Sequence, residues 1–472
     1  MTPSVRQKDW SATADGMPWG VAIAFLAILA GCDELERSIF KGTARDVPPD
    51  CTTSAECSDP AKPICNQGQC EPCTNTQQCL SRAGEGASQE RGDVCLLQSR
   101  GGQGTCGPCL DNSECPSGFC FTTDLQMLFA SAPSKPDVLK PGRCIPDAAT
   151  KYVKYSPDTI ACAQADGSSE KPYCQAADAL AAQSQQPVLV LRLLSSPAVH
   201  PAINVVGGGK TVLLVGAKST SLDPAVQVER VVVQNAKLVL DGIAIAAPSN
   251  TTAAMCDVAA ELVIKRSSVA PAPKAMYTDF AIANGIDSSP ACNRLVVEQS
   301  LIRSFTNIGI RAQAKDVRIT NNGVIFINKP DSDPTYGSVF LSGQSGLMAH
   351  NTIVNNPAAM ACSAGNRIQI LNNIIAGNDA QDVTTCGAIA GQNYVRASAR
   401  NIPFYVADNI RSGELVAKQL RIASDIDVFF GCCINKAMPD SNAVTIDFFG
   451  CSRPLAGMNL DYGFHQHNGC SP

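Results

Sequence analysis

The chain has 472 residues and a formal net charge of −5 at pH 7, which is close to neutral for its size. No basic stripe is present to neutralise phosphates, so the charge pattern argues against nucleic-acid binding. Both tryptophans lie in the first 19 residues, which leaves eight tyrosines as the rings on which a sugar would most readily stack. The length predicts two or three domains.

The first 32 residues have the order of an export signal. A polar leader with basic residues precedes an apolar run, Val21–Ala30. That run has about ten strongly apolar residues, roughly half of what a transmembrane helix needs. Residues 29–32, Leu-Ala-Gly-Cys, resemble the lipobox of bacterial lipoproteins. The resemblance implies removal of a signal peptide at 1–31 and lipid on Cys32, which would hold the protein on a membrane. An ordinary cleaved signal and a retained helix are the alternatives.

Twelve of the 23 cysteines fall within residues 51–144, behind a tether at 32–50. If Cys32 carries lipid, an even and dense set remains, which in an exported chain predicts a disulfide framework. The twelve form three blocks that open with Cys-x5-Cys and close with Gly-x-Cys. The blocks are Cys51, Cys57, Cys65 and Cys70; Cys73, Cys79, Cys95 and Cys106; and Cys109, Cys115, Cys120 and Cys144. We predict that every bridge stays within its block.

Two Cys-x2-Cys pairs in this region have the spacing of zinc knuckles, Cys70 with Cys73 and Cys106 with Cys109. They are the joints between blocks, however, and an export compartment oxidises thiols. We therefore expect no metal there. The blocks resemble cysteine-rich repeats that follow the lipobox in bacterial envelope lipoproteins, a resemblance that implies no particular activity.

From about residue 150 onwards, short apolar strands separated by polar turns form a repeat. The aligned units begin at Leu238, Leu262, Leu295, Val317, Leu347 and Ile368, so successive units are 24, 33, 22, 30 and 21 residues apart. A short repeat with insertions predicts a solenoid of stacked parallel strands. The competing fold, a β-sandwich, should show alternating strands joined by hairpin turns. A short helix is expected at Lys171–Gln186, before the first strands.

Asparagine recurs at the turn of the last three units, as Asn321, Asn351 and Asn372. Asparagine tolerates left-handed backbone angles. The pattern resembles the asparagine ladder of right-handed parallel β-helices, the fold of pectate lyases and of many non-enzymatic surface proteins. Two further segments resemble that family, a glycine-rich opening at 207–216 and the tail at 447–463.

The resemblance implies an all-β fold, a right-handed parallel β-helix solenoid preceded by a small disulfide-rich region. In chain order, the expected parts are a lipoprotein signal peptide at 1–31, a tether at 32–50, three four-cysteine modules at 51–144, the β-helix at 150–400 and its C-terminal cap at 401–472.

Further bridges are expected within the β-helix, where adjacent coils stack about 4.8 Å apart and a disulfide needs Cα atoms about 4.4–6.8 Å apart. Cys256 lies six residues before the strand that starts at Leu262, and Cys292 lies three before the next strand, so these two can meet if the approaches run side by side. By the same reasoning Cys362 can meet Cys386 one coil later. We expect Cys162 and Cys174 to fix the short helix. Four tail cysteines should pair among themselves, namely Cys432, Cys433, Cys451 and Cys470.

No catalytic motif is recognisable, and no metal-binding residues are assigned. If the chain is an enzyme, carboxylates and a base must line one face of the coil. The weak candidates lie in insertions between units, namely Asp287, Arg311, Lys329, Asp331 and Asp333. Because coils stack about 4.8 Å apart, Asp287, Arg311 and Asp331 could lie within reach of one another. Solvated loop charges are the favoured reading.

These features predict a lipid-anchored envelope protein, at an outer membrane or cell surface rather than the inner membrane. The expected role is binding or adhesion, to a polysaccharide or another envelope component. The alternative is a polysaccharide lyase or glycoside hydrolase that acts through the long loops, and a purely structural role is a third. No cofactor is expected, except calcium if the protein is a lyase. No nucleotide is expected, because the Gly209-Lys210-Thr211 sequence lacks the first glycine of a phosphate loop.

Overall fold

A computed structural model describes residues 51–396 apart from short gaps. The gaps are 60, 85–93, 97–103, 110–113, 116–118, 122–141, 146–148, 159–161, 163, 187, 217–224, 273–283, 326, 328–337, 355, 357–358, 377–382, 385 and 387–393. Cys32 with its lipobox, the tether, the expected cap and the four tail cysteines all lie outside the described residues.

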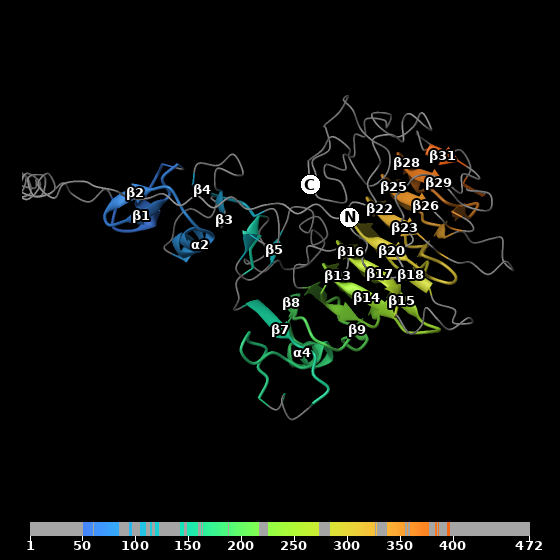
Figure 1. Ribbon diagram of the computed structural model, residues 1–472, viewed down its shortest axis with the longest axis horizontal. Coiled ribbons are helices and arrows are strands. Elements are labelled where there is room, and N and C mark those ends of the chain that lie inside the picture. The colour runs from blue at the N-terminus through green and yellow to red at the C-terminus, as the bar shows by residue number, and fades with distance from the viewer. Residues whose placement is uncertain are drawn as a thin grey trace, which may run out of the picture.

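The larger part of the chain is a parallel β-helix built from three sheets (Figure 1). Sheet 1 contains nine strands: β7 (Thr150–Val153), β8 (Val188–Leu193), β10 (Thr211–Val215), β13 (Lys237–Asp241), β16 (Glu261–Lys265), β19 (Arg294–Glu298), β22 (Asp316–Thr320), β25 (Ser345–Ala349) and β28 (Gln369–Leu371).

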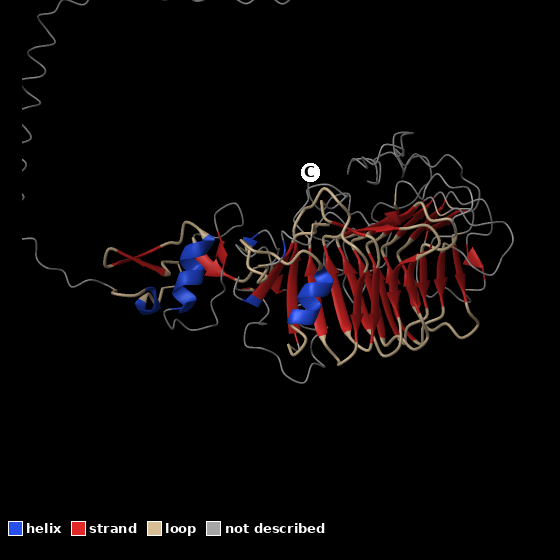
Figure 2. Ribbon diagram, turned by 90° about the horizontal axis from the view of Figure 1, so that it is seen from below, coloured by secondary structure: helices blue, strands red, loops and turns tan. Residues whose placement is uncertain are grey.

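The other two sheets have eight strands each, and in all three sheets each strand pairs in parallel with strands of neighbouring coils (Figure 2). Sheet 2 contains β11 (Gln227–Val228), β14 (Ala244–Ala247), β17 (Ser268–Pro271), β20 (Leu301–Arg303), β23 (Gly323–Ile325), β26 (Thr352–Val354), β29 (Ile374–Ala376) and β31 (Tyr394–Arg396). Sheet 3 contains β9 (Ile203–Val206), β12 (Val231–Gln234), β15 (Thr252–Cys256), β18 (Asn284–Ser288), β21 (Ile310–Ala312), β24 (Val339–Leu341), β27 (Met360–Cys362) and β30 (Val383–Thr384).

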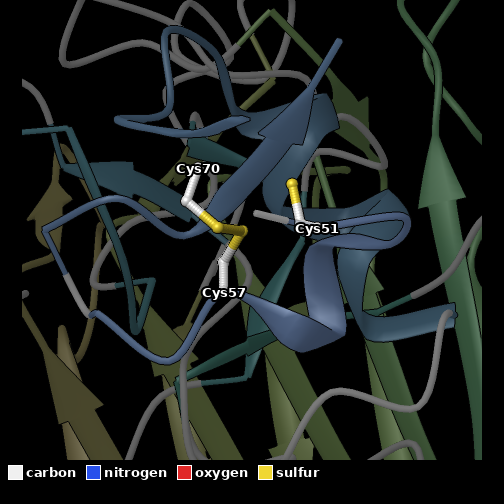
Figure 3. Close-up of side chains that lie close together, drawn as sticks. All are labelled: Cys51, Cys57 and Cys70. Atoms are coloured by element: carbon white, nitrogen blue, oxygen red, sulfur yellow. A yellow bond between two sulfur atoms is a disulfide. The ribbon is translucent and has the colours of Figure 1, made fainter. Parts of the chain in front are cut away.

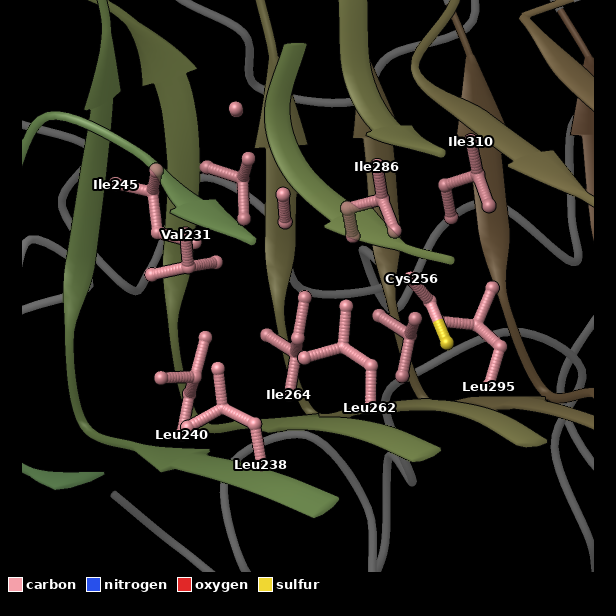
Figure 4. Packing of buried hydrophobic residues seen from close by; sticks show 14 of the residues in the cluster. Val231, Leu238, Leu240, Ile245, Cys256, Leu262, Ile264, Ile286, Leu295 and Ile310 are labelled. Atoms are coloured by element: carbon pink, nitrogen blue, oxygen red, sulfur yellow. The ribbon is translucent and has the colours of Figure 1, made fainter. Parts of the chain in front are cut away.

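The core is a set of apolar columns that run along the solenoid axis. Leu238, Leu262 and Leu295 are register partners on successive coils, and all three are fully buried (Figure 4). Burying one such side chain stabilises the fold by about 1.5–3 kcal/mol. The alternation of strand side chains explains the repeat that the sequence shows, because every coil must supply an apolar residue at the same inward position.

The fifth repeat unit is shifted by one residue from its expected alignment. Val317 pairs with Gly346, and Arg318 pairs with Leu347, so Leu347 does not continue the inward column. A Cβ on Gly346 would lie 1.9 Å from the carbonyl oxygen of Val317, so the inward position admits only glycine. An apolar pattern does not mark a position without a side chain, so the sequence predicts the next residue, Leu347, in place of Gly346.

The same shift corrects the expected asparagine ladder. Asn321 and Asn372 share one column with His350, and these three residues have φ angles of 57°, 53° and 55°. The ladder itself lies one residue later, and of the three predicted asparagines only Asn351 belongs to it. Its members, all buried, are Ser267, Ser300, Asn322, Asn351 and Asn373.

A short helix, α4 (Ala176–Ala182), packs at the first coils. Ala176 and Ala179 join the main apolar core there. The expected helix at Lys171–Gln186 is too long at both ends, since the helix ends at Ala182. At its start, Tyr173 exchanges backbone hydrogen bonds with the β7 region instead. Its amide donates to Tyr152 O at 2.9 Å.

The cysteine blocks form three small modules with one shared bridge pattern, first to third and second to fourth cysteine. The six bridges are Cys51–Cys65, Cys57–Cys70, Cys73–Cys95, Cys79–Cys106, Cys109–Cys120 and Cys115–Cys144. All twelve cysteines form disulfides, and no bridge joins two blocks, as predicted. The module elements are η1 (Ser54–Glu56), β1 (Ile64–Asn66), β2 (Gln69–Glu71), α2 (Thr76–Gly84), β3 (Val94–Leu96), β4 (Thr105–Gly107), β5 (Cys120–Phe121) and β6 (Arg143–Cys144).

Apolar contacts join the modules to one another and to the β-helix. Ile64 of the first module packs with cysteines of the second, and Val94 of the second packs with cysteines of the third. Phe119, Phe121 and Ile145 of the third module pack on the outward valine and leucine side chains of sheet 1. The third module therefore docks on the solenoid wall.

Three more bridges lie within or beside the β-helix, and they join the pairs named from the sequence. The Cα separations are 5.7 Å for Cys256–Cys292, 4.6 Å for Cys362–Cys386 and 5.8 Å for Cys162–Cys174. The first two connect neighbouring coils at the ends of sheet 3 strands.

Candidate functional site

Asp287 on β18 and Arg311 on β21 face outward on sheet 3 as direct register partners. Arg311 Nε donates to Asp287 Oδ1 at 2.8 Å, and Nη2 of the same guanidinium contacts Oδ2. The rung spacing predicts this approach, and the register confirms it. A catalytic role for either residue stays a prediction. Both carboxylate oxygens of Asp287 contact the guanidinium of Arg311.

The other three enzymatic candidates, Lys329, Asp331 and Asp333, lie outside the described residues. Whether Asp331 meets the Asp287–Arg311 pair therefore stays a prediction. Arg303 is on β20 in sheet 2, away from the sheet 3 pair.

The ion pair belongs to a column of outward residues that crosses five coils, which we call the sheet 3 stripe. Its members are Val232, Met255, Asp287, Arg311 and Phe340. All five are half-buried, so each presents part of its side chain to solvent. The stripe thus alternates from apolar to charged and back to apolar, a surface that can contact both the carbon faces and the polar groups of an extended ligand.

Carboxylates on sheet 1 are paired from coil to coil in the same way. Glu298 accepts from Arg318 Nε at 2.8 Å and lies 3.3 Å from Lys265 Nζ. Burial raises the pKa of Glu298, but the positive charges of Lys265 and Arg318 outweigh burial and hold that pKa below its ordinary value. The general acid of a glycosidase is a carboxylic acid with a raised pKa, which keeps it protonated. The two cations lower the pKa of Glu298, so this residue does not have that property.

Sequence reasoning missed the Glu298 cluster, although a signal was present. Asp241, Lys265 and Glu298 are successive register partners at the end of their strands, so their charges alternate along the column. Arg266, which follows Lys265, makes a two-pronged contact with Asp241 in which Nε donates to Oδ1 at 2.7 Å. Opposite charges at equivalent repeat positions indicate such rung-to-rung pairs.

A cavity of about 670 Å³ lies at the base of the β-helix, and we call it the base cavity. Three segments line it: 154–157 after β7, 164–174 before α4, and 196–198 after β8. The Cys162–Cys174 bridge closes the second segment. Sequence analysis did not predict this cavity, because strand pairing and a disulfide bring its three segments together.

Three groups of cysteine sulfurs lie close enough to suit a metal, one in each module. Figure 3 shows the first group, in which Cys57 is bonded to Cys70 while Cys51 lies beside them. Every sulfur in these groups belongs to a disulfide, Cys51 through its bond to Cys65. A metal ligand must be a thiolate, so the oxidised modules do not fit zinc.

Comparison of the chain with protein-family models, with curated proteins and with solved structures gives no match. Among the described residues, no helix has the length and apolar character needed to cross a membrane. The nine disulfides of the described region are typical of proteins outside the cytoplasm, where thiols are oxidised.

Proposed function

We propose that this protein is a lipid-anchored component of a bacterial cell envelope, at an outer membrane or cell surface. Its β-helix, with a pectate-lyase-like fold, would bind a polysaccharide or another envelope component without cleaving it. The sequence at residues 29–32 supports the anchor, and the disulfides support an oxidising compartment. A protein held in this way presents its solenoid to extended polymers of the envelope.

The observation that carries the binding role is the sheet 3 stripe. The Asp287–Arg311 pair has hydrogen-bonding groups that remain partly exposed, and Met255 and Phe340 flank it on the adjacent coils. Paired charges give directional polar contacts, while the flanking apolar side chains can pack on sugar rings. In the same pair, both carboxylate oxygens of Asp287 contact the guanidinium of Arg311.

The test is binding of the full chain, solubilised in detergent, to an array of immobilised envelope polysaccharides. We expect retention on at least one polysaccharide, and Arg311→Ala should weaken it by about tenfold, the loss that one charge-assisted contact implies. Arg318→Ala is a matched control. Its side chain is 34% exposed against 33% for Arg311, and it also pairs with a carboxylate on the preceding coil, but on sheet 1.

Two results would overturn the proposal. Equal losses for the two arginine variants would remove the stripe from the binding site. Release of unsaturated sugars, measured by their ultraviolet absorbance, would show a lyase and restore the enzymatic alternative that works through the long loops.

A further inference from the structure

We propose that the base cavity is a second binding site, which takes a single carboxylated sugar unit. The proposal goes beyond the sheet 3 stripe, because the cavity is formed by different segments and is sized for a small ligand. Its volume, about 670 Å³, lies within the range of small-molecule sites.

The walls of the cavity are held by bonds that do not depend on a ligand. Ser196 Oγ donates to Tyr155 O at 2.9 Å, which ties the third segment to the first. The Lys154 amide donates to Tyr173 O at 2.8 Å, which ties the first segment to the second. The disulfide from Cys174 closes the second segment on itself. A site that is already formed binds with less loss of conformational entropy.

The second segment is further braced by a tight turn. The amides of Asp166 and Gly167 both donate to Lys171 O, at 3.1 Å and 3.0 Å. Gly167 has a φ of 79°, and a Cβ there would lie 2.4 Å from the ring of Tyr173. The backbone of Lys171 is therefore fixed while its side chain stays exposed at the cavity.

The chemistry of the lining selects a ligand with an apolar face and a negative charge. Three prolines, Pro157, Pro172 and Pro197, join Tyr155 to form apolar walls on which a sugar ring can pack. Lys154 and Lys171 also line the cavity, and Lys171 lies near the carboxylate of Asp166 as well. The lining therefore carries two ammonium groups, which can attract a carboxylate.

One acidic residue, Glu170, lines the cavity as well, so the lining has an excess of one positive charge. Its carboxylate can accept hydrogen bonds from sugar hydroxyls, which a purely cationic site could not do. Asp166 lies near Lys171 but does not line the cavity. This arrangement fits a uronate better than a phosphate, because a uronate combines one charge with several hydroxyl donors.

The experiment is calorimetric titration of the detergent-solubilised full chain with trigalacturonate, and with the matching neutral trisaccharide of galactose. We expect the acidic probe to bind at least about tenfold more tightly, the difference expected from one charge-assisted contact. Lys171→Gln should remove most of that preference, and the double variant with Lys154→Gln should remove all of it. Lys315→Gln, an exposed lysine on another part of the solenoid, is the control for net charge.

Equal affinity for the two probes, or equal losses in Lys171→Gln and Lys315→Gln, would overturn the proposal. Absence of binding to either probe would do the same. The result is separable from the stripe, because Arg311→Ala should leave the short acidic probe bound as tightly as before.

Discussion

Asn322 and Asn351 lie on successive coils with their amides in contact, the Nδ2 of Asn322 donating to the Oδ1 of Asn351 at 3.0 Å. The same Oδ1 also accepts the backbone amide of Asn322, at 3.0 Å. Asn351 in turn donates to Ile319 O at 2.8 Å and to Asn373 Oδ1 at 2.9 Å. A fully satisfied buried network of this kind fixes the turn between sheets 1 and 2.

Replacing Asn351 should therefore destabilise the solenoid. Asn351→Ala leaves the buried amide of Asn322 without its acceptor, and the free energy of unfolding should fall by about 2–4 kcal/mol, because several contacts are lost at once. Asn351→Ser should lose roughly half as much, since Ser300 and Ser267 already serve as acceptors in this column. Urea denaturation with intact disulfides measures both. Equal stability of Asn351→Ala and the wild type would contradict the ladder.

A second prediction concerns the glycine that closes the second module. Gly104 has a φ of 76°, and a Cβ there would lie 2.6 Å from the Cβ of Pro72. Its carbonyl also accepts the Cys73 amide at 2.6 Å. Gly104→Ala should therefore impair pairing of Cys73 with Cys95 and of Cys79 with Cys106.

Peptide mapping of the unreduced protein would show mispaired or free cysteines in the Gly104→Ala variant. Gly365→Ala is the control, because a Cβ at Gly365 meets nothing within 4 Å. The close packing of Gly104 on Pro72 would be unimportant if both variants gave the native bridge map.

The third prediction is a pH dependence that arises from Glu298. Its pKa in the folded protein lies below the ordinary value of 4.5, because Lys265 and Arg318 outweigh the effect of burial. The unfolded chain then binds more protons in the interval between the two values. The stabilisation is complete above about pH 4.5 and is lost as the pH falls through the folded-state pKa.

Glu298→Gln should flatten this acid limb of the stability curve, measured by urea unfolding from pH 7 down to pH 3. Glu261→Gln is a matched control on the same sheet. Its carboxylate pairs with Lys237, at 3.0 Å. If the free energy of unfolding fell as steeply with acid in Glu298→Gln as in the wild type, the pH dependence would come from other carboxylates.

The fourth prediction tests the proposed anchor. Cys32→Ser should move the protein from the membrane pellet to the soluble fraction after a carbonate wash, because no lipid can be attached. Asp33→Ser keeps the lipobox and should stay with the membranes. Retention of Cys32→Ser in the pellet would show that something other than lipid on this cysteine holds the protein.

The sequence predicts the solenoid well because each coil repeats the same inward apolar positions, as Leu238, Leu262 and Leu295 show. It fails at Gly346, where close packing against Val317 removes the side chain that the pattern needs. A single omitted side chain was enough to displace the predicted ladder by one residue. Register is thus the feature most exposed to error in a repeat with insertions.

Of the two candidate sites, the sequence predicts one and not the other. Asp287 and Arg311 could be placed together, because equivalent positions on adjacent coils are neighbours whatever the length of the insertion between them. The base cavity could not, because Tyr155 and Ser196 meet only through the pairing of β7 with β8. Local periodicity carries no information about such a contact.

The docking of Phe119, Phe121 and Ile145 on sheet 1 has a mechanical consequence. A pull applied at residue 51 cannot straighten the modules, because two covalent bridges in each of them shorten the path that bears the load. The force would instead pass into the apolar seam between the third module and the first coils. The apolar seams, there and between the modules, should therefore yield under tension before the disulfide-bonded modules do.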